Sequence, residues 1–206
     1  MNYILTAISI VLLFQSSRFA WKRFKSDKSL HKEVYFKKPL DWLWAFLLVV
    51  LMFVLVGLFN SVQMPQFLKW SWLQLLQSDN KGSNLIVSPF IHSGSKIVSG
   101  IFFILMFLII PFLAKSEEEA FRDGVFGFLS RIKSSLIFGL IHMIVGVPLY
   151  IAIFIGVIGW FFSVRYVWSY NKTESQQEAL ISATSLHSKY NFIILTFAAI
   201  LVIFMT

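Results

Sequence analysis

The chain has 206 residues, of which 57% are hydrophobic and only 14% are charged. Soluble domains usually carry about 25% charged residues, so this composition excludes an ordinary soluble domain and is typical of a membrane protein. Lys and Arg outnumber Asp and Glu by 18 to 10, and the absence of cysteine excludes disulfides, thiol chemistry and cysteine-based metal sites.

Long apolar stretches along the chain predict transmembrane helices, each of which needs about 20 mostly apolar residues. Four such stretches are 2–17, 42–62, 97–114 and 180–206. The stretch 134–168 is too long for one crossing, and Pro148, preceded by Gly146, predicts a break that divides it into two spans. We therefore expect an all-α, polytopic membrane helix bundle of about six transmembrane helices, or five if this stretch is partly re-entrant.

Basic residues are concentrated in segment 18–38, which holds eight of the 18 lysines and arginines. A basic block can bind nucleic acid, but in so apolar a chain it is typical of a cytoplasmic loop beside anionic lipid heads. We therefore expect 18–38 and 115–133 to face the cytosol, and 63–96 to lie at the outer interface. The lipid bilayer, and not nucleic acid, is the expected partner.

The chain shows no internal repeat, low-complexity tract or linker, so we expect one integral membrane domain over 1–206. The N-terminal stretch lacks the basic n-region of a signal peptide and carries its positive charge after the apolar run, which is typical of a retained first span.

Ionisable residues within or beside the spans are the candidates for a functional site, because polar groups in lipid are costly. Of the four histidines, His31 and His92 fall in loops and are expected to be solvated. The remaining candidates are Glu117, Glu118, Glu119, Arg122, His142 and His187.

Three pairs of residues are four positions apart, so each pair shares one helical face: Glu118 with Arg122, Phe138 with His142, and His187 with Asn191. A carboxylate and a histidine that meet can hold and deprotonate a water molecule. Two converging N–H donors can stabilise the oxyanion that forms when this water attacks a carbonyl. These groups suffice for peptide-bond hydrolysis without a metal ion, another cofactor or a covalent intermediate.

Each pattern also has a purely structural interpretation. The sequence EEEAFR is common at solvated helix ends, and a histidine between membrane helices often makes only an interhelical hydrogen bond. The segment around His187 can also be a helix start at the headgroup boundary, with Lys189 reaching out to the interface. The occurrence of all three patterns in one membrane chain favours the chemical interpretation.

Together these patterns form the series EExxxR, FxxxH and HxxxN, carried by Glu117, Glu118, Arg122, Phe138, His142, His187 and Asn191. The series resembles that of the CAAX-protease and bacteriocin-processing family of intramembrane glutamic endopeptidases, which includes the Ras-converting CAAX prenyl endopeptidases. The resemblance covers 97–206 and makes this part the expected catalytic core, whereas 1–96 is only generally membrane-like.

The resemblance implies an all-helical bundle whose active site is sunk in the membrane and opens towards the cytosol. It implies that Glu117 and His142 activate the attacking water and that His187 and Asn191 form the oxyanion hole. Glu118 and Arg122 would shape the site.

The expected function is therefore cleavage of a membrane-tethered tail, a leader peptide or a small membrane protein near the cytosolic membrane face. The main alternative is a non-catalytic relative that binds a partner membrane protein or assists its assembly. A small transporter with a Glu/His proton relay is disfavoured, because the chain lacks paired half-helices and internal symmetry. A zinc site of His142, His187 and Glu117 also stays open at this stage.

Overall fold

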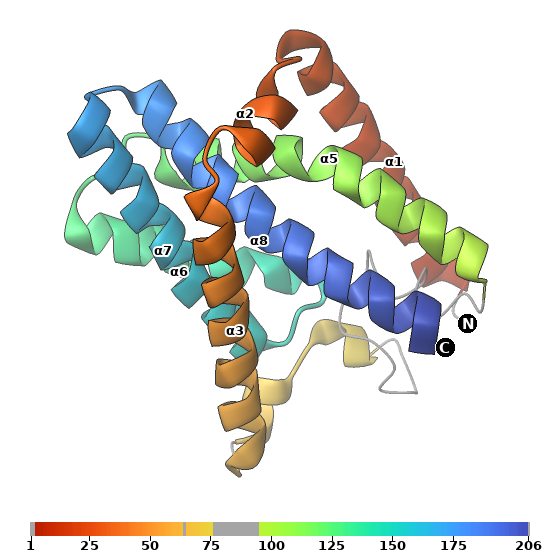
Figure 1. Cartoon of the computed structure of the whole chain (residues 1–206). Coiled ribbons are helices and arrows are strands. Elements are labelled where there is room, and N and C mark those ends of the chain that lie inside the picture. Colours follow the sequence, from red (N-terminus) through yellow and green to blue (C-terminus); the bar gives the residue numbers. More distant parts are fainter. Residues whose placement is uncertain (1–2, 64, 76–94, 206) are drawn as a thin grey trace.

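The structure is a computed structural model that describes residues 3–63, 65–75 and 95–205; within these ranges the chain is helical and has no β-strand (Figure 1). Its elements are α1 (Tyr3–Ser26), α2 (Leu30–Phe36), α3 (Leu40–Ser61), η1 (Gln66–Lys69), η2 (Trp72–Leu75), α5 (Lys96–Arg122), α6 (Phe128–Ile141), η3 (His142–Val145), α7 (Leu149–Thr173) and α8 (Gln176–Met205). The predicted all-α class is confirmed.

Five helical stretches of the described chain are long and apolar enough to cross a membrane: Leu40–Ser61, Lys96–Arg122, Phe128–Val145, Leu149–Thr173 and Gln176–Ile203. They correspond to five of the expected spans, and this agreement supports a multi-pass integral membrane protein. The expected span 2–17 lies in α1, which is not among the five. Helix α1 continues to Ser26, and its second half contains the first cations of the basic segment.

The predicted break within 134–168 is confirmed. Gly146 adopts the left-handed conformation with φ of 88°, and Pro148 directly precedes the first turn of α7. Residues at the start of η2 hold the chain before Pro148 in place: Trp72 Nε1 donates to Met143 O at 2.7 Å and Ser71 Oγ donates to Gly146 O at 2.5 Å. Most of the expected outer segment 63–96, including His92, lies outside the described residues.

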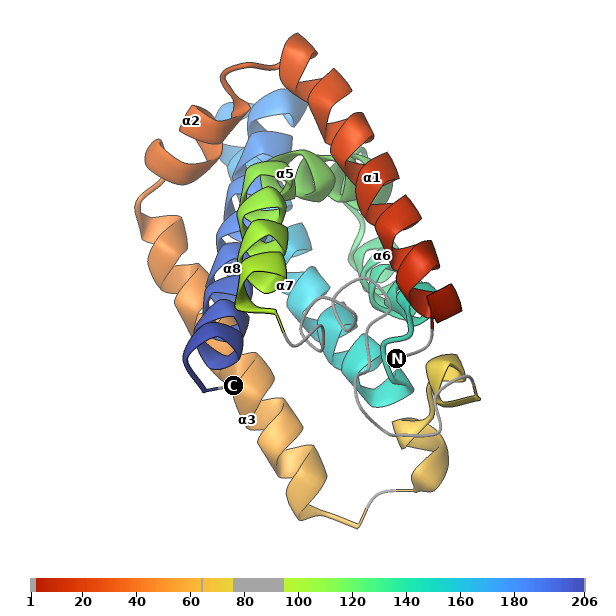
Figure 2. The same cartoon turned by 90° about the vertical axis from the view of Figure 1, so that its right-hand side faces the viewer.

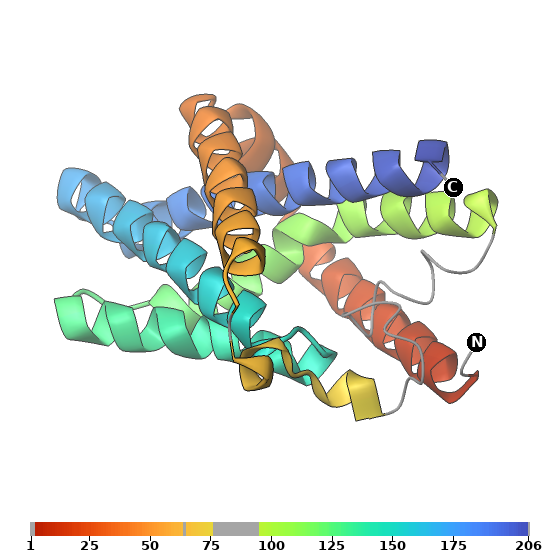
Figure 3. The same cartoon turned by 90° about the horizontal axis from the view of Figure 1, so that it is seen from below.

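Helix α8 is the central helix of the bundle. It runs antiparallel to α5 and also packs against α7, α3 and α2 (Figures 1 and 3). All residues from 181 to 190 are buried, although several of them are polar. A buried polar group is costly without a partner, and Ser185, His187 and Lys189 make hydrogen bonds to other segments of the chain.

Helices α6 and α7 form a close hairpin. A Cβ atom at Gly139 would lie 2.2 Å from Ala152 O and 2.5 Å from Gly156 N, so only glycine allows the two backbones to approach this closely. Small residues at such contacts are typical of membrane helices, where close packing replaces the hydrophobic driving force.

We expect Gly139→Ala to destabilise the protein by about 1–3 kcal/mol, because the clash is with backbone atoms that cannot turn away. Equilibrium unfolding in mixed micelles measures this change. Gly57→Ala is the matched control, since a Cβ there meets nothing within 4 Å. Equal stability of Gly139→Ala and the wild-type protein would contradict the observed packing.

The segments expected to face the cytosol meet at one end of the bundle, where the C-terminal end of α1 and α2 lie near the N-terminal end of α8 (Figures 1 and 2). Lys115 Nζ donates to Asp27 Oδ2 at 2.7 Å, and Arg23 pairs with Glu119 at 2.8 Å. These contacts place the basic segment 18–38 and the end of α5 on the same side.

His31 is partly exposed, and it also makes contacts that a purely solvated histidine would not make. Its Nε2 lies 3.0 Å from Leu108 O and donates to this carbonyl, because a carbonyl oxygen only accepts. The ring also packs against Phe112 with a centroid distance of 5.0 Å. His31 therefore anchors α2 on α5, shortly before Pro111, which removes one backbone hydrogen bond of α5.

The topology is directly testable because the chain contains no cysteine. We expect single cysteines at Ser26 and Ser61, both exposed and placed at opposite ends of the bundle, to react with an impermeant thiol reagent from opposite sides of the membrane. Ser26→Cys should react from the cytosolic side. Labelling of both from one side would contradict this topology.

Candidate functional site

The candidate site lies where the last turns of α5 meet the buried middle of α8. Glu118 Oε1 lies 2.8 Å from His187 Nδ1, which joins residues far apart in the sequence. The Glu118 and His187 side chains are 0% and 3% exposed, respectively. A carboxylate accepts and the ring nitrogen donates, so the contact fixes the ring orientation of His187.

Arg122 supplies the buried positive charge of the site. Its Nε lies 3.4 Å from Glu118 Oε2, with both side chains fully buried, so the predicted pairing one turn apart is confirmed. Nη2 of Arg122 also donates to Gly159 O at 3.1 Å. The guanidinium stacks over the Phe138 ring at 4.2 Å, which adds a cation–π contact.

Glu117 approaches the other nitrogen of the same imidazole. Its Oε2 lies 3.5 Å from His187 Nε2, and its side chain is 38% exposed, so it alone of the two glutamates reaches solvent. When Nδ1 of His187 carries a proton towards Glu118, a neutral ring has a lone pair on Nε2 that would repel an ionised Glu117. The contact is therefore favourable only when either His187 Nε2 or Glu117 carries an additional proton.

His142 packs against Phe138, as the FxxxH spacing predicts. The two ring centroids are 5.0 Å apart, and Nδ1 of His142 donates to Phe138 O at 2.8 Å. In a neutral imidazole this leaves Nε2 as an acceptor. The Phe138 ring also contacts His187 at 5.5 Å, so both imidazoles flank one aromatic ring.

Asn191 lies one turn after His187 on α8 and is partly exposed. Within the described chain its amide makes no hydrogen bond with another side chain, and both nitrogens of His187 face carboxylates. In this structure His187 pairs with the two glutamates. It therefore does not offer a free N–H donor beside the amide of Asn191.

The structure also bears on the open zinc alternative. Among residues 3–63, 65–75 and 95–205, no group of three or more His, Asp or Glu side chains could hold a metal ion. His142, His187 and Glu117 are thus not arranged as a ligand set here.

Helix α7 contributes two contacts that sequence reasoning missed. Phe162 stacks on His187 with a centroid distance of 4.5 Å, and Gly159 O accepts from Arg122. A Cβ at Gly159 would lie 2.6 Å from the Phe138 ring and 2.8 Å from Arg122 Nη2. The spacing of small residues at Gly156, Gly159 and Ser163 is the sequence signal that could have indicated this close helix face.

Glu119 points away from His187 and pairs with Arg23 on α1. We expect Glu119→Gln to change the free energy of unfolding by less than about 1 kcal/mol, because partly exposed ion pairs contribute little. Unfolding of the two proteins in mixed micelles measures the difference. Damage as large as that caused by Glu118→Gln would contradict the side-chain directions along α5.

Comparison with models of protein families, with curated proteins and with solved structures found no match to this chain. The case for a function therefore rests on the side chains described above and on the motif series that they carry.

Proposed function

We propose that this chain is an intramembrane glutamic endopeptidase, similar to the CAAX-protease group, that hydrolyses a peptide bond near the cytosolic membrane face. The observation that carries this proposal is the contact of Glu117 and Glu118 with opposite nitrogens of the His187 imidazole. Such a cluster can take and return a proton, as general acid–base hydrolysis requires.

The two glutamates have different surroundings and so different roles in the proposal. Glu118 is fully buried between Arg122 and His187, and it orients the imidazole. Glu117 is partly exposed, so its carboxylate is the one that can reach a water molecule and a substrate carbonyl. Neighbouring carboxylates can take different roles when burial and a nearby charge, here that of Arg122, act on them unequally.

His142 is the second histidine of the proposal. Its Nδ1 bond to Phe138 O leaves Nε2 able to accept a proton, which is the property needed for the water-activating role that the motif resemblance implies. Asn191, at the partly exposed side of α8, supplies the amide donor for the developing oxyanion in this scheme.

The proposed substrate is a polypeptide held in or at the membrane, because the partly exposed Glu117 lies near the end of an apolar span, beside the basic segment 18–38. The test is a comparison of membrane-peptide termini in cells that carry the wild-type protein, Glu117→Gln or Glu119→Gln. We expect a set of termini to be lost with Glu117→Gln and retained with Glu119→Gln.

Identical termini in all three strains would contradict the proposal. Unchanged termini combined with the loss of a membrane protein in cells that lack the chain would instead support the alternative of a binding or assembly factor.

A further inference from the structure

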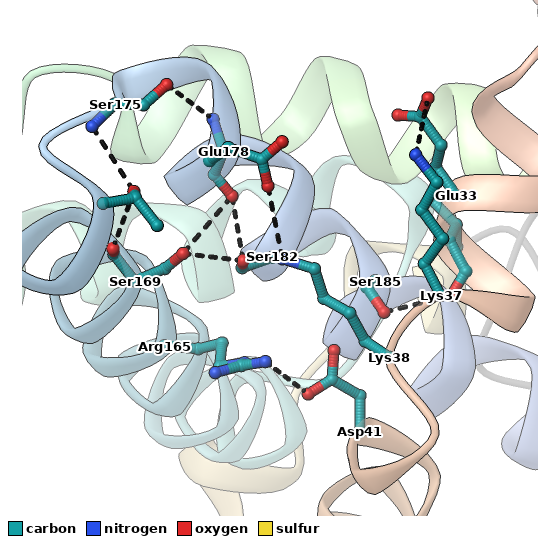
Figure 4. A network of polar contacts seen from close by, with 12 residues as sticks. Glu33, Lys37, Lys38, Asp41, Arg165, Ser169, Ser175, Glu178, Ser182 and Ser185 are labelled. Atoms are coloured by element: carbon teal, nitrogen blue, oxygen red, sulfur yellow. Dashed lines mark hydrogen bonds and ion pairs between the residues drawn. The ribbon is translucent and has the colours of Figure 1, made fainter.

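Residues 34–41 (the elbow) comprise the last residues of α2, the turn to α3 and the first residues of α3. They are held against α8 by side-chain hydrogen bonds, and Figure 4 shows the one made by Ser185. Ser185 Oγ donates to Val34 O at 3.0 Å, and Lys189 Nζ donates to Lys38 O at 2.6 Å. Val34 O lies in the last turn of α2, where the helix offers no backbone donor, so Ser185 of α8 caps this end of α2. Lys38 O lies in the turn between α2 and α3 and also accepts from Asp41 N at 3.1 Å, so Lys189 joins this turn to α8.

Lys189 is fully buried, so the alternative interpretation in which it reaches out to the interface is wrong. Its ammonium also donates to Ser185 Oγ at 3.1 Å and lies 5.5 Å from the centre of the Trp42 ring. Lysine is rarely fully buried unless its ammonium has partners. Here these partners are Lys38 O of the elbow, the Trp42 ring and Ser185 of α8 itself.

Side chains of the elbow also make contacts with α8 and α7 (Figure 4). The Lys38 ammonium donates to Ser182 Oγ and lies 3.7 Å from Glu178 Oε2, both on the first turns of α8. Burial lowers the pKa of Lys38, and the Glu178 carboxylate opposes this shift. Asp41 pairs with Arg165 of α7 at 2.9 Å, so the elbow is a fixed support for α8.

Ser185 and Lys189 flank His187 by two positions on either side. Since successive residues of an α-helix are about 100° apart, both point to the face of α8 opposite His187. A rotation of α8 that broke the bonds to the elbow would also move His187 away from Glu118, which it contacts at 2.8 Å. The contacts of α8 with the elbow on one face and with Glu118 on the other therefore depend on the same helix rotation.

We propose that Ser185 and Lys189 are positioning residues that use the elbow to set the rotation of α8 and so hold His187 against Glu118. This linkage does not depend on which reaction the site performs. Its consequence for cleavage rests on the proposed function.

The experiment uses full-length protein with ¹⁵N-labelled histidine in nanodiscs, with the His187 resonances assigned by their loss in His187→Gln. Lys189→Met removes the donor but keeps most of the volume, and Ser185→Ala removes the smaller contact. Lys172→Met, an exposed lysine at the same end of the bundle, is the matched control.

We expect Lys189→Met to shift the His187 imidazole ¹⁵N resonances in a folded protein, Ser185→Ala to shift them less, and Lys172→Met to leave them unchanged. In a cleavage assay Lys189→Met should lower kcat at least about tenfold and change KM little, because a displaced catalytic group slows the chemical step rather than binding.

Unchanged His187 resonances in folded Lys189→Met would overturn the proposal; if that variant does not fold, unchanged resonances in Ser185→Ala would do so. The two proposals fail separately. If the wild-type protein cleaves nothing, the proposed function fails, while the His187 resonances still decide whether the elbow positions this side chain.

Discussion

Replacing Glu117 by glutamine is expected to abolish proteolysis and to leave a folded, membrane-inserted protein. Glutamine keeps the shape of the side chain but cannot take a proton from water, and loss of a general base typically lowers the rate by about 10²–10⁴. Glu117 is partly exposed and its Oε2 contacts only the edge of His187, so its removal should not disturb packing. Cleavage of an identified substrate by purified protein measures the effect.

Double variants test whether Glu117 and the histidines act as one unit. Residues that act together are not additive, so Glu117→Gln combined with His142→Gln or with His187→Gln should be little slower than the slowest single variant. Glu119→Gln is the control and should retain activity, because Glu119 pairs with Arg23 outside the site.

Full activity of Glu117→Gln would contradict the assignment. Loss of wild-type activity on treatment with EDTA, with recovery on addition of zinc, would also contradict it and would favour a metal mechanism.

Arg122→Met is expected to cause the largest loss of stability of any substitution near the site. Both Arg122 and Glu118 are fully buried, so methionine leaves the Glu118 carboxylate without its cation. Removal of one partner of a buried ion pair costs about 3–5 kcal/mol, chiefly because the other charge stays buried. Equilibrium unfolding in mixed micelles measures the loss.

The double variant Glu118→Gln with Arg122→Met should recover much of that loss, since neither charge then remains in the bundle. Lys133→Met is the matched control, because Lys133 is an exposed cation on α6. Strictly additive effects of Glu118→Gln and Arg122→Met would show that the two side chains do not stabilise each other.

Local features of this protein could be predicted from its sequence. Hydropathy and length predicted five spans that the structure contains, because a helix in lipid must satisfy its backbone within its own segment, whereas the expected span 2–17 is not among them. The pairs Glu118–Arg122 and Phe138–His142 form as predicted, since residues four apart on one helix are neighbours whatever surrounds them. The break at Gly146 is likewise local, being set by a left-handed residue and a nearby proline.

The relations between helices were decided only by the tertiary structure. Spacing showed that His187 and Asn191 share a face, but not that Glu118 would accept a hydrogen bond from Nδ1 of His187. Nor did spacing show that Lys189, on the opposite face, would be buried against the turn between α2 and α3. These contacts depend on the rotation and depth of each helix against its neighbours. Rotation and depth are fixed by packing such as that at Gly139 and Gly159, whose partners lie on other helices.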